Sequence, residues 1–364
     1  MTAIRAHADL TLQIVVGASA LLDRYGSVVD LIEKDGFAPD ERIHMLIEGE
    51  TPLTMAQSTG FGLMELARVF DRLKPDIVLT VGDRFETMAT AIAASYMNIP
   101  LAHTMGGEIS GTIDESIRHA VTKLAHLHFP ANAHAAERII RMGEDPKSVH
   151  VVGCPRMDVV MDIAAKHPAP PSRAWLEQEG VGGHIHLSGP YLLVMQHPVT
   201  TEYGQGEEHI TETLFALQEI GLPVFMLWPN ADAGSEDISR GMRKFREQHH
   251  PEHIRFYKNF PLDVFVPLLA HCACMAGNSS AAIREGSFLG IPAVNVGTRQ
   301  QGRERGGNTL DVPCDRHAII AAIRRQIAHG RYPANPLYGD GKAGKRIADL
   351  LAHAPLVIAK RMTY

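Results

Sequence analysis

Residues 273–286 combine a backbone pattern and side chains suited to binding a phosphate. A short apolar strand is expected over 273–276, followed by Gly-Asn-Ser-Ser at 277–280 and then a stretch compatible with a helix. Free N–H groups and the positive dipole end at a helix start favour a phosphate. Ser279 and Ser280 can cap the helix or donate to the same oxygens, and Glu285 can accept from ribose hydroxyls. An ordinary serine cap with a surface glutamate is the alternative for this segment alone.

A second group follows the apolar strand expected over residues 77–81, at Gly82-Asp83-Arg84. Glycine permits a sharp exit from the strand, and an aspartate can serve as a base or a hydrogen-bond anchor. An arginine can hold a phosphate through two N–H bonds. Asp83 could instead only cap the next helix.

Three carboxylates, Glu108, Asp114 and Glu115, lie close together after the strand expected over residues 101–103. Acids near a helix start are common because of the helix dipole alone. The Gly-Gly pair before Glu108, however, lets the backbone approach a ligand closely. Together with Asp83, these acids could move protons on both faces of a sugar ring.

In the second half of the chain, polar side chains again follow strand ends. His197 comes after the strand expected over 191–196 and precedes a proline, so it is well held to meet a pyrophosphate or protonate a leaving group. Asn230 follows the next strand and could offer an amide to a nucleotide. Arg299 supplies a second cation in the loop after 293–296, where a solvated loop is an equal interpretation.

Short apolar strands alternate with amphipathic stretches along the whole chain, which is typical of parallel sheets covered by helices. The expected strands are 12–17, 42–47, 77–81, 101–103, 127–130, 149–152, 191–196, 224–228, 254–257, 272–276 and 293–296. The glycine-rich stretch in 180–190 indicates a hinge. The pattern predicts an α/β protein of two Rossmann-like, doubly wound lobes, residues 1–179 and 191–364, facing across a cleft. In such folds ligands bind beyond the carboxyl ends of strands.

Composition narrows the class of protein. The 364 residues are 45% hydrophobic and 21% charged with a formal net charge of −6, so they offer no electrostatic footprint for nucleic acid. No apolar run approaches the roughly 20 residues of a membrane helix, and residues 1–10 lack a signal-peptide layout. Four cysteines without a Cys-x-x-Cys pair are too few for a disulfide framework and fit a cytoplasmic protein. The 20 histidines are scattered without zinc-ligand spacing, so no metal is expected.

Taken together, these segments resemble the hydrolysing UDP-N-acetylglucosamine 2-epimerases of sialic-acid-type sugar synthesis, including the epimerase half of the bifunctional epimerase/N-acetylmannosamine kinase. The resemblance runs from about residue 12 to residue 351. It is carried by residues 82–85, 106–120, 196–201, 230–235, 277–280, 297–300 and 338–341. It implies a two-lobed fold of the glycosyltransferase GT-B type. The implied reaction is anti elimination of UDP, then addition of water to release N-acetylmannosamine, without metal or cofactor.

The resemblance also assigns roles to residues. It implies that UDP is held by Arg84, His197, Asn230, Ser279, Ser280, Glu285 and Arg299. It places Asp83 and Asp114 at acid/base positions of the family. At position 105 many relatives have glutamate and others histidine, whereas this chain has Met105, which cannot transfer a proton. We therefore expect Glu108 or Glu115 to transfer the proton in place of residue 105, or the substrate to differ.

The start of the chain also departs from the family pattern. The first family strand and its Gly-x-Arg-type loop have no counterpart, so the N-terminal lobe is expected to lack its first strand. A start codon assigned too late or a shortened enzyme would account for this, and we expect this form to be poorly stable or weakly active.

Four alternatives to the UDP-N-acetylglucosamine epimerase remain. A hydrolysing epimerase of UDP-2,4-diacetamido-2,4,6-trideoxyglucose, in the legionaminic pathway, would use the same UDP site. A non-hydrolysing epimerase is disfavoured by the Gly-Gly-Glu and Thr-Ile-Asp-Glu segments, and a glycosyltransferase shares the fold. A catalytically impaired nucleotide-sugar binder belongs to another class. By resemblance, a homodimer or homotetramer is expected.

Overall fold

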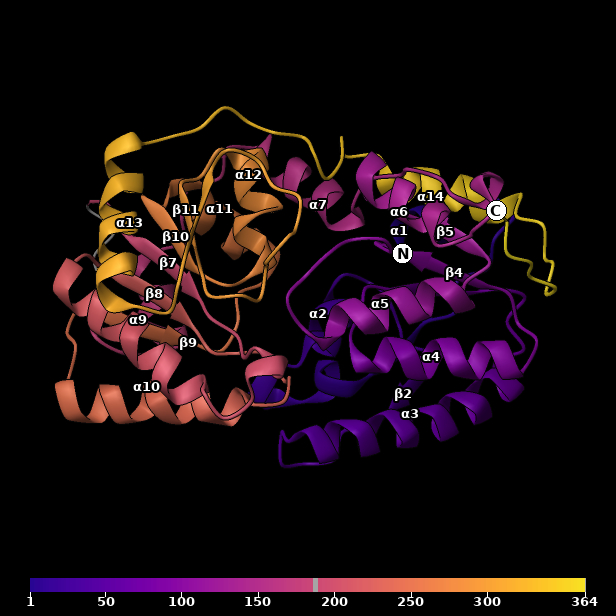
Figure 1. The fold of residues 1–364 in the computed structure, drawn as a ribbon, viewed down its shortest axis with the longest axis horizontal. Helices are drawn as coiled ribbons and strands as arrows, with labels where there is room; N and C mark the ends of the chain where they lie inside the picture. The colour runs from indigo at the N-terminus through magenta and orange to yellow at the C-terminus, as the bar shows by residue number, and fades with distance from the viewer. Residues whose placement is uncertain (186–188, 364) are drawn as a thin grey trace. The chain divides into compact units, whose positions relative to one another are not determined.

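The chain forms two α/β units, each built around parallel strands (Figure 1). The computed structural model describes residues 1–185 and 189–363. Unit 1 comprises residues 1–109, 113–159 and 338–364, and unit 2 comprises residues 110–112 and 160–337. The C-terminal end of the chain therefore belongs to the same unit as the N-terminal end.

Unit 2 contains a seven-stranded sheet in the order β12-β11-β10-β7-β8-β9-β6. Its strands are β6 (Gly180–Gly182), β7 (Leu192–Met195), β8 (Val224–Leu227), β9 (Ile254–Tyr257), β10 (Cys274–Gly277), β11 (Ala293–Val296) and β12 (Thr309–Val312). All neighbours are parallel except β6 and β9. From β7 the chain runs to β8 and β9 on one side and returns to β10 on the other. The strand order thus reverses between β7 and β10, which is where ligands bind in such sheets.

Helices cover both faces of this sheet (Figure 1). They are α8 (Arg173–Glu179), α9 (Gly206–Ile220), α10 (Ser235–His249), α11 (Leu262–His271), α12 (Glu285–Leu289) and α13 (Arg316–His329). Leu214 of α9, Met242 of α10 and Ile323 of α13 are fully buried against the strands in one core cluster. Burial on both faces explains why the strands are continuous apolar runs rather than alternating patterns.

Unit 1 contains its parallel strands in two separate sheets. One joins β1 (Val15–Gly17) to β2 (Glu41–Ile43), and the other joins β3 (Val78–Val81), β4 (Leu101–Thr104) and β5 (Leu127–Phe129) in that order. Both sheets contribute to a single core cluster that contains Ile43, Val78 and Leu101. Within the described residues, no strand pairs with the second edge of β1 or of β3. That the N-terminal lobe lacks the first strand of the family stays a prediction.

The helices of unit 1 follow from local signals. They are α1 (Thr2–Ala6), α2 (Val28–Lys34), α3 (Pro52–Leu73), α4 (Phe85–Tyr96), α5 (Ile113–Leu124), α6 (Ala133–Arg141) and α14 (Ala343–Ala352), while α7 (Pro155–Ala164) spans the boundary between the units. Thr51 and Thr54 form a capping box at the start of α3, with proline in its first position. Asn132 caps α6 by accepting from the Ala135 N–H.

The structure differs from the sequence-based expectations at residues 149–152, at the predicted hinge and at β12, which the expected strands did not include. Residues 149–152 do not form a strand and make only an isolated bridge between Val149 and His128. The glycines of the predicted hinge form β6, which pairs antiparallel with β9 at the edge of the sheet. Of the predicted hinge at 180–190, residues 186–188 lie outside the described residues. The domain boundary at 180–190 stays a prediction.

Candidate functional site

The loop after β3 presents Asp83 on a tightly anchored turn. Gly82 has φ of +82°, a conformation that glycine adopts readily. The Nε2 atom of His103, on the neighbouring strand β4, lies 2.7 Å from the Gly82 carbonyl oxygen. Burial lowers the pKa of His103 to about 4, so the ring is neutral at neutral pH and donates its Nε2–H to that carbonyl. The turn that carries Asp83 is therefore held by the buried strand beside it.

Arg118 of α5 joins two of the predicted catalytic segments. Its Nε donates to Asp83 Oδ2 at 3.0 Å, and its Nη2 makes a second bond to the same oxygen. Its Nη1 donates to the main-chain carbonyl of Glu108 at 2.7 Å. The Arg118 side chain is only 1% exposed. One guanidinium therefore fixes the Asp83 carboxylate and the Gly-Gly-Glu loop relative to each other.

Sequence reasoning gave Arg118 no role. The only hint in the sequence was its position one turn after Asp114 and Glu115, two candidate catalytic residues. An arginine on the buried face of an otherwise amphipathic helix needs an anionic or carbonyl partner, but the sequence does not reveal which partner.

The other candidate acids of unit 1 are Glu108, Asp114 and Glu115, which lie on α5 or in the loop before it. Asp114 and Glu115 occupy the first turn of α5, and Glu115 lies 3.6 Å from His119 one turn later. The Glu108 side chain follows Gly107 and is completely buried. The structure thus brings Asp83 and the main chain of Glu108 together through Arg118, and the same helix carries Asp114 and Glu115.

Two further residues of unit 1 were singled out by sequence. Arg84 follows Asp83 and pairs with Glu86 at 3.1 Å. Met105 has φ of 63°, and its sulfur lies 3.8 Å from the thiol of the buried Cys154. The N–H of Met105 donates to the Phe129 carbonyl at the end of β5. Met105 therefore places an apolar, non-titrating side chain at the start of the Gly-Gly-Glu loop.

In unit 2, His197 and Asn278 follow β7 and β10, the two strands between which the strand order reverses. The His197 N–H donates to Asn278 Oδ1 at 2.7 Å, and Asn278 Nδ2 donates to the His197 carbonyl at 2.8 Å. The Asn230 N–H donates to His197 Nδ1 at 3.1 Å. Because Nδ1 accepts, the neutral ring carries its proton on Nε2. His197 can therefore donate a hydrogen bond through Nε2.

Arg299 lies in the same part of unit 2. Its Nη1 is 3.4 Å from the Asn278 carbonyl, and its Nη2 is 3.6 Å from the carboxylate of Asp232. The buried Gln300 also donates to the Asn278 carbonyl, at 2.9 Å. Asn278 and Gln300, which the sequence-based site did not include, are the residues that connect His197 and Arg299.

The serine loop has a shorter helix than the sequence suggested. Ser279 accepts a hydrogen bond from the Ala281 N–H and so caps a single 3₁₀ turn, Ser280–Ala282. The five-residue helix α12 begins after it, at Glu285, whose side chain is 2% exposed. The fold therefore brings the predicted UDP-binding residues of unit 2 to the carboxyl edge of one sheet. Their ligand roles stay predictions.

Metal-ligating side chains do not cluster in the described part of the chain. No group of three or more histidine, cysteine, aspartate or glutamate side chains there is arranged to hold a metal ion. Cys272, Cys274 and Cys314 form no disulfide bond among the described residues. In the described part of the chain, no helix has both the length and the apolar character needed to cross a membrane.

Comparison with known proteins gives consistent matches over almost the whole chain. The family profile for UDP-N-acetylglucosamine 2-epimerase matches residues 2–352. The UDP-N,N'-diacetylbacillosamine 2-epimerase (hydrolyzing) of Legionella pneumophila is 33% identical over 348 residues, covering 96% of this chain and 89% of that protein. The UDP-N-acetylglucosamine 2-epimerase of Neisseria meningitidis serogroup B is 30% identical, covering 93% of this chain and 85% of that protein.

The fold is shared with a solved structure. The crystal structure of UDP-GlcNAc 2-epimerase from Neisseria meningitidis bound to UDP-GlcNAc aligns with a TM-score of 0.79 and 18% identity, covering 96% of this chain and 94% of that one. At this identity the likeness concerns the fold alone, and it confirms the predicted α/β class with two Rossmann-like lobes.

Proposed function

We propose that this chain, which belongs to the UDP-N-acetylglucosamine 2-epimerase family, is a hydrolysing 2-epimerase of UDP-N-acetylglucosamine. In the first step a carboxylate removes the C2 proton while the C1–O bond to UDP breaks, giving a glycal. In the second step water adds its hydroxyl to C1 and a proton returns to C2 on the other face. The products are N-acetylmannosamine and UDP, which serve sialic-type sugar synthesis.

The observation that supports this proposal best is the clamp made by Arg118 in unit 1. It holds the Asp83 carboxylate at a strand end and ties it to the loop of Glu108. Removing a weakly acidic C2 proton requires a carboxylate held in one place relative to the sugar. We assign Asp83 and Asp114 to proton transfer, and Glu108 or Glu115 to the role that Met105 cannot fill.

Unit 2 supports the proposal through the groups at its strand ends. Loss of UDP puts negative charge on the leaving diphosphate, so oriented donors and cations that favour this charge stabilise the transition state. His197, with its proton on Nε2, and Arg299 are suited to this task. We assign Ser279 and Ser280 to the phosphates, and Asn230 and Glu285 to the nucleoside.

A second candidate substrate, UDP-N,N'-diacetylbacillosamine, is supported by the name of a relative. The Legionella relative, at 33% identity, is named for UDP-N,N'-diacetylbacillosamine, a 2,4-diacetamido-2,4,6-trideoxy sugar. This sugar has no C6 hydroxyl, and an apolar side chain such as Met105 would suit it. The chemistry at C1 and C2 is the same for both substrates.

Product analysis in isotopically labelled water tests the proposal. Each UDP-sugar is incubated with the protein in heavy-oxygen deuterium oxide, the reaction is quenched promptly, and the products are identified by mass spectrometry. The expected result is a free 2-epimer with heavy oxygen at C1 and deuterium at C2, together with unlabelled UDP. A product that keeps its UDP would show a non-hydrolysing epimerase instead. UDP binding without any released sugar would show a binding protein.

The oligomeric state and the cellular location are also proposals. We propose a homo-oligomer, since α3 exposes the apolar side chains of Leu53, Phe61 and Met64. Light scattering coupled to size exclusion would measure the mass directly, and a monomer at micromolar concentration would contradict this. The cytoplasmic location expected from the cysteine content stays a prediction.

A further inference from the structure

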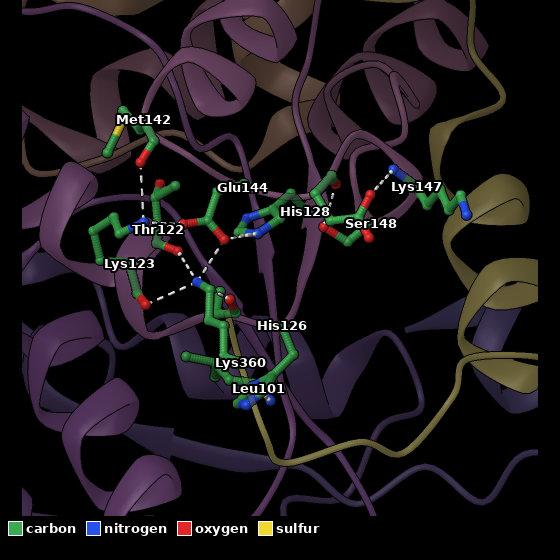
Figure 2. Close-up of polar contacts among 12 residues, drawn as sticks. Leu101, Thr122, Lys123, His126, His128, Met142, Glu144, Lys147, Ser148 and Lys360 are labelled. Atoms are coloured by element: carbon green, nitrogen blue, oxygen red, sulfur yellow. Dashed lines mark hydrogen bonds and ion pairs between the residues drawn. The ribbon is translucent and has the colours of Figure 1, made fainter. Parts of the chain in front are cut away.

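A buried polar cluster lies in unit 1 at the opposite end of α5 from Asp114 and Glu115. We call Glu144, His128, Lys123 and Lys360 the Glu144 cluster (Figure 2). Glu144 is 1% exposed. Its Oε1 accepts from Lys123 Nζ at 2.5 Å, and its Oε2 lies 2.6 Å from Lys360 Nζ and 3.1 Å from His128 Nε2. A carboxylate so placed is fully partnered, and the proposed reaction uses none of these groups.

The charges in this cluster favour an ionised Glu144. Burial by itself raises the pKa of this carboxyl, but hydrogen bonds from His128, Lys123 and Lys360 outweigh it and lower the pKa to about 2. The cluster therefore persists as an ion-paired group at neutral pH.

Lys360 belongs to the C-terminal tail, residues 354–363, which is anchored along unit 1. Its ammonium donates to the main-chain carbonyls of Thr122, Lys123 and Ala125, at 3.0, 2.8 and 2.5 Å. These carbonyls are at the end of α5, where helical carbonyls lack partners within the helix and the dipole favours a cation. Lys360 thus acts as a C-cap supplied from more than 200 residues away in the sequence.

Two further contacts hold the tail on either side of Lys360. The Ile358 carbonyl lies 3.0 Å from His126 Nε2, and the Thr363 N–H donates to the Gly143 carbonyl at 2.9 Å. His126 Nδ1 accepts from the Leu101 N–H, so its Nε2 carries the proton and donates a hydrogen bond to the Ile358 carbonyl. The tail is therefore attached at three points around the end of α5.

Helix α5 connects this anchor to the candidate catalytic groups. Lys360 binds its last turn, while Arg118, one turn earlier, binds Asp83 and the Glu108 main chain. The first turn carries Asp114 and Glu115. A short helix fixed at its last turn and at Arg118 transmits a shift of its C-terminal end to the groups on its earlier turns.

We propose that Lys360 is a positioning residue for the reaction: it holds α5 in the position at which Arg118 binds Asp83. Release of Lys360 frees the last turn of α5 and loosens the clamp, so turnover falls while the nucleotide groups of unit 2 are unaffected. The catalytic part of this inference rests on the proposed function. Its structural part rests on the contacts of Lys360 alone.

Three variants test the inference: Lys360→Met, Lys360→Arg, and Lys345→Met as a matched control. Lys345 is 75% exposed and pairs with Asp349 within α14. Each variant is assayed for kcat, KM and UDP binding, and by hydrogen exchange with mass spectrometry over residues 113–125. All measurements are made well below the melting transition of every variant.

For Lys360→Met we expect kcat to fall roughly 10- to 100-fold, as small misplacements of catalytic groups do. KM and UDP affinity should stay within about twofold, and amides in 113–125 should exchange faster. Lys360→Arg should restore kcat and the slow exchange, because the arginine guanidinium also donates to several carbonyls. Lys345→Met should match the wild type. Unchanged exchange over 113–125, or an equal loss in Lys345→Met, would overturn the inference. A wild-type chain that releases no sugar would refute the proposed function, while the exchange result would still decide whether Lys360 holds α5.

Discussion

The substitution Arg118→Lys tests the clamp that links the predicted catalytic segments. Lysine keeps the positive charge but replaces a planar fork with a single ammonium. Arg118 makes two bonds to Asp83 and one to the Glu108 carbonyl, so the shorter lysine can satisfy only part of this set. Because the side chain is 1% exposed, water cannot easily replace the lost donors.

The expected magnitude follows from these contacts. A hydrogen bond to a charged group contributes about 1.5–3 kcal/mol, and one or two such bonds are lost. One to two such bonds span about 1.5–6 kcal/mol, and because the lysine ammonium keeps part of the set, we expect the free energy of unfolding of Arg118→Lys to fall by about 2–4 kcal/mol. Arg118→Met would leave the Asp83 carboxylate without its main partner and should cost about 3–5 kcal/mol. The kcat of Arg118→Lys should fall by about 100-fold, since Asp83 is no longer held in one place.

Urea unfolding followed by circular dichroism measures the free energy of unfolding, and steady-state sugar release measures kcat. The control is Arg68→Lys on α3, where the arginine is 79% exposed and pairs with Glu65. It should change stability by less than about 0.5 kcal/mol. If Arg118→Lys were as stable and as active as the control, the clamp would have no role in either folding or catalysis.

Three other predictions follow from single positions. The pKa of Glu144 is about 2 in the folded protein, below its ordinary value, so its stabilisation is present above about pH 4.5 and lost as the pH falls towards 2. Urea titrations across this range should show a loss of at most about 3 kcal/mol that is absent in Glu144→Gln; parallel curves would contradict it. Gly60 lies inside α3 with nothing within 4 Å of an added Cβ, so Gly60→Ala should raise the free energy of unfolding by about 0.5–1 kcal/mol in the same assay. Gly277 has φ of +115°, and an added Cβ would lie 2.1 Å from the Met195 carbonyl. Gly277→Ala should therefore displace Asn278 and weaken UDP binding by calorimetry, and unchanged affinity would remove this turn from the nucleotide site.

Strand ends and the loops that follow them were predictable from local pattern. The strands at 77–81, 191–196 and 293–296 contain the observed β3, β7 and β11, because buried parallel strands are apolar runs that end at turn residues. Once these strands are located, the rule that ligands lie beyond their carboxyl ends selects the loops of Asp83 and His197. The family followed from the same loops.

Several features were decided by tertiary structure alone. Gly180–Gly182 has no strand pattern, and it becomes β6 only because β9 offers an open edge. Arg118 is 35 residues from Asp83, and Lys360 is more than 200 residues from Glu144. The sequence determined most of the segments that form strands and helices, since those signals are local. Which distant charge each buried side chain meets depended on how the elements pack, because pairing of buried ions is set by distances that no local pattern contains.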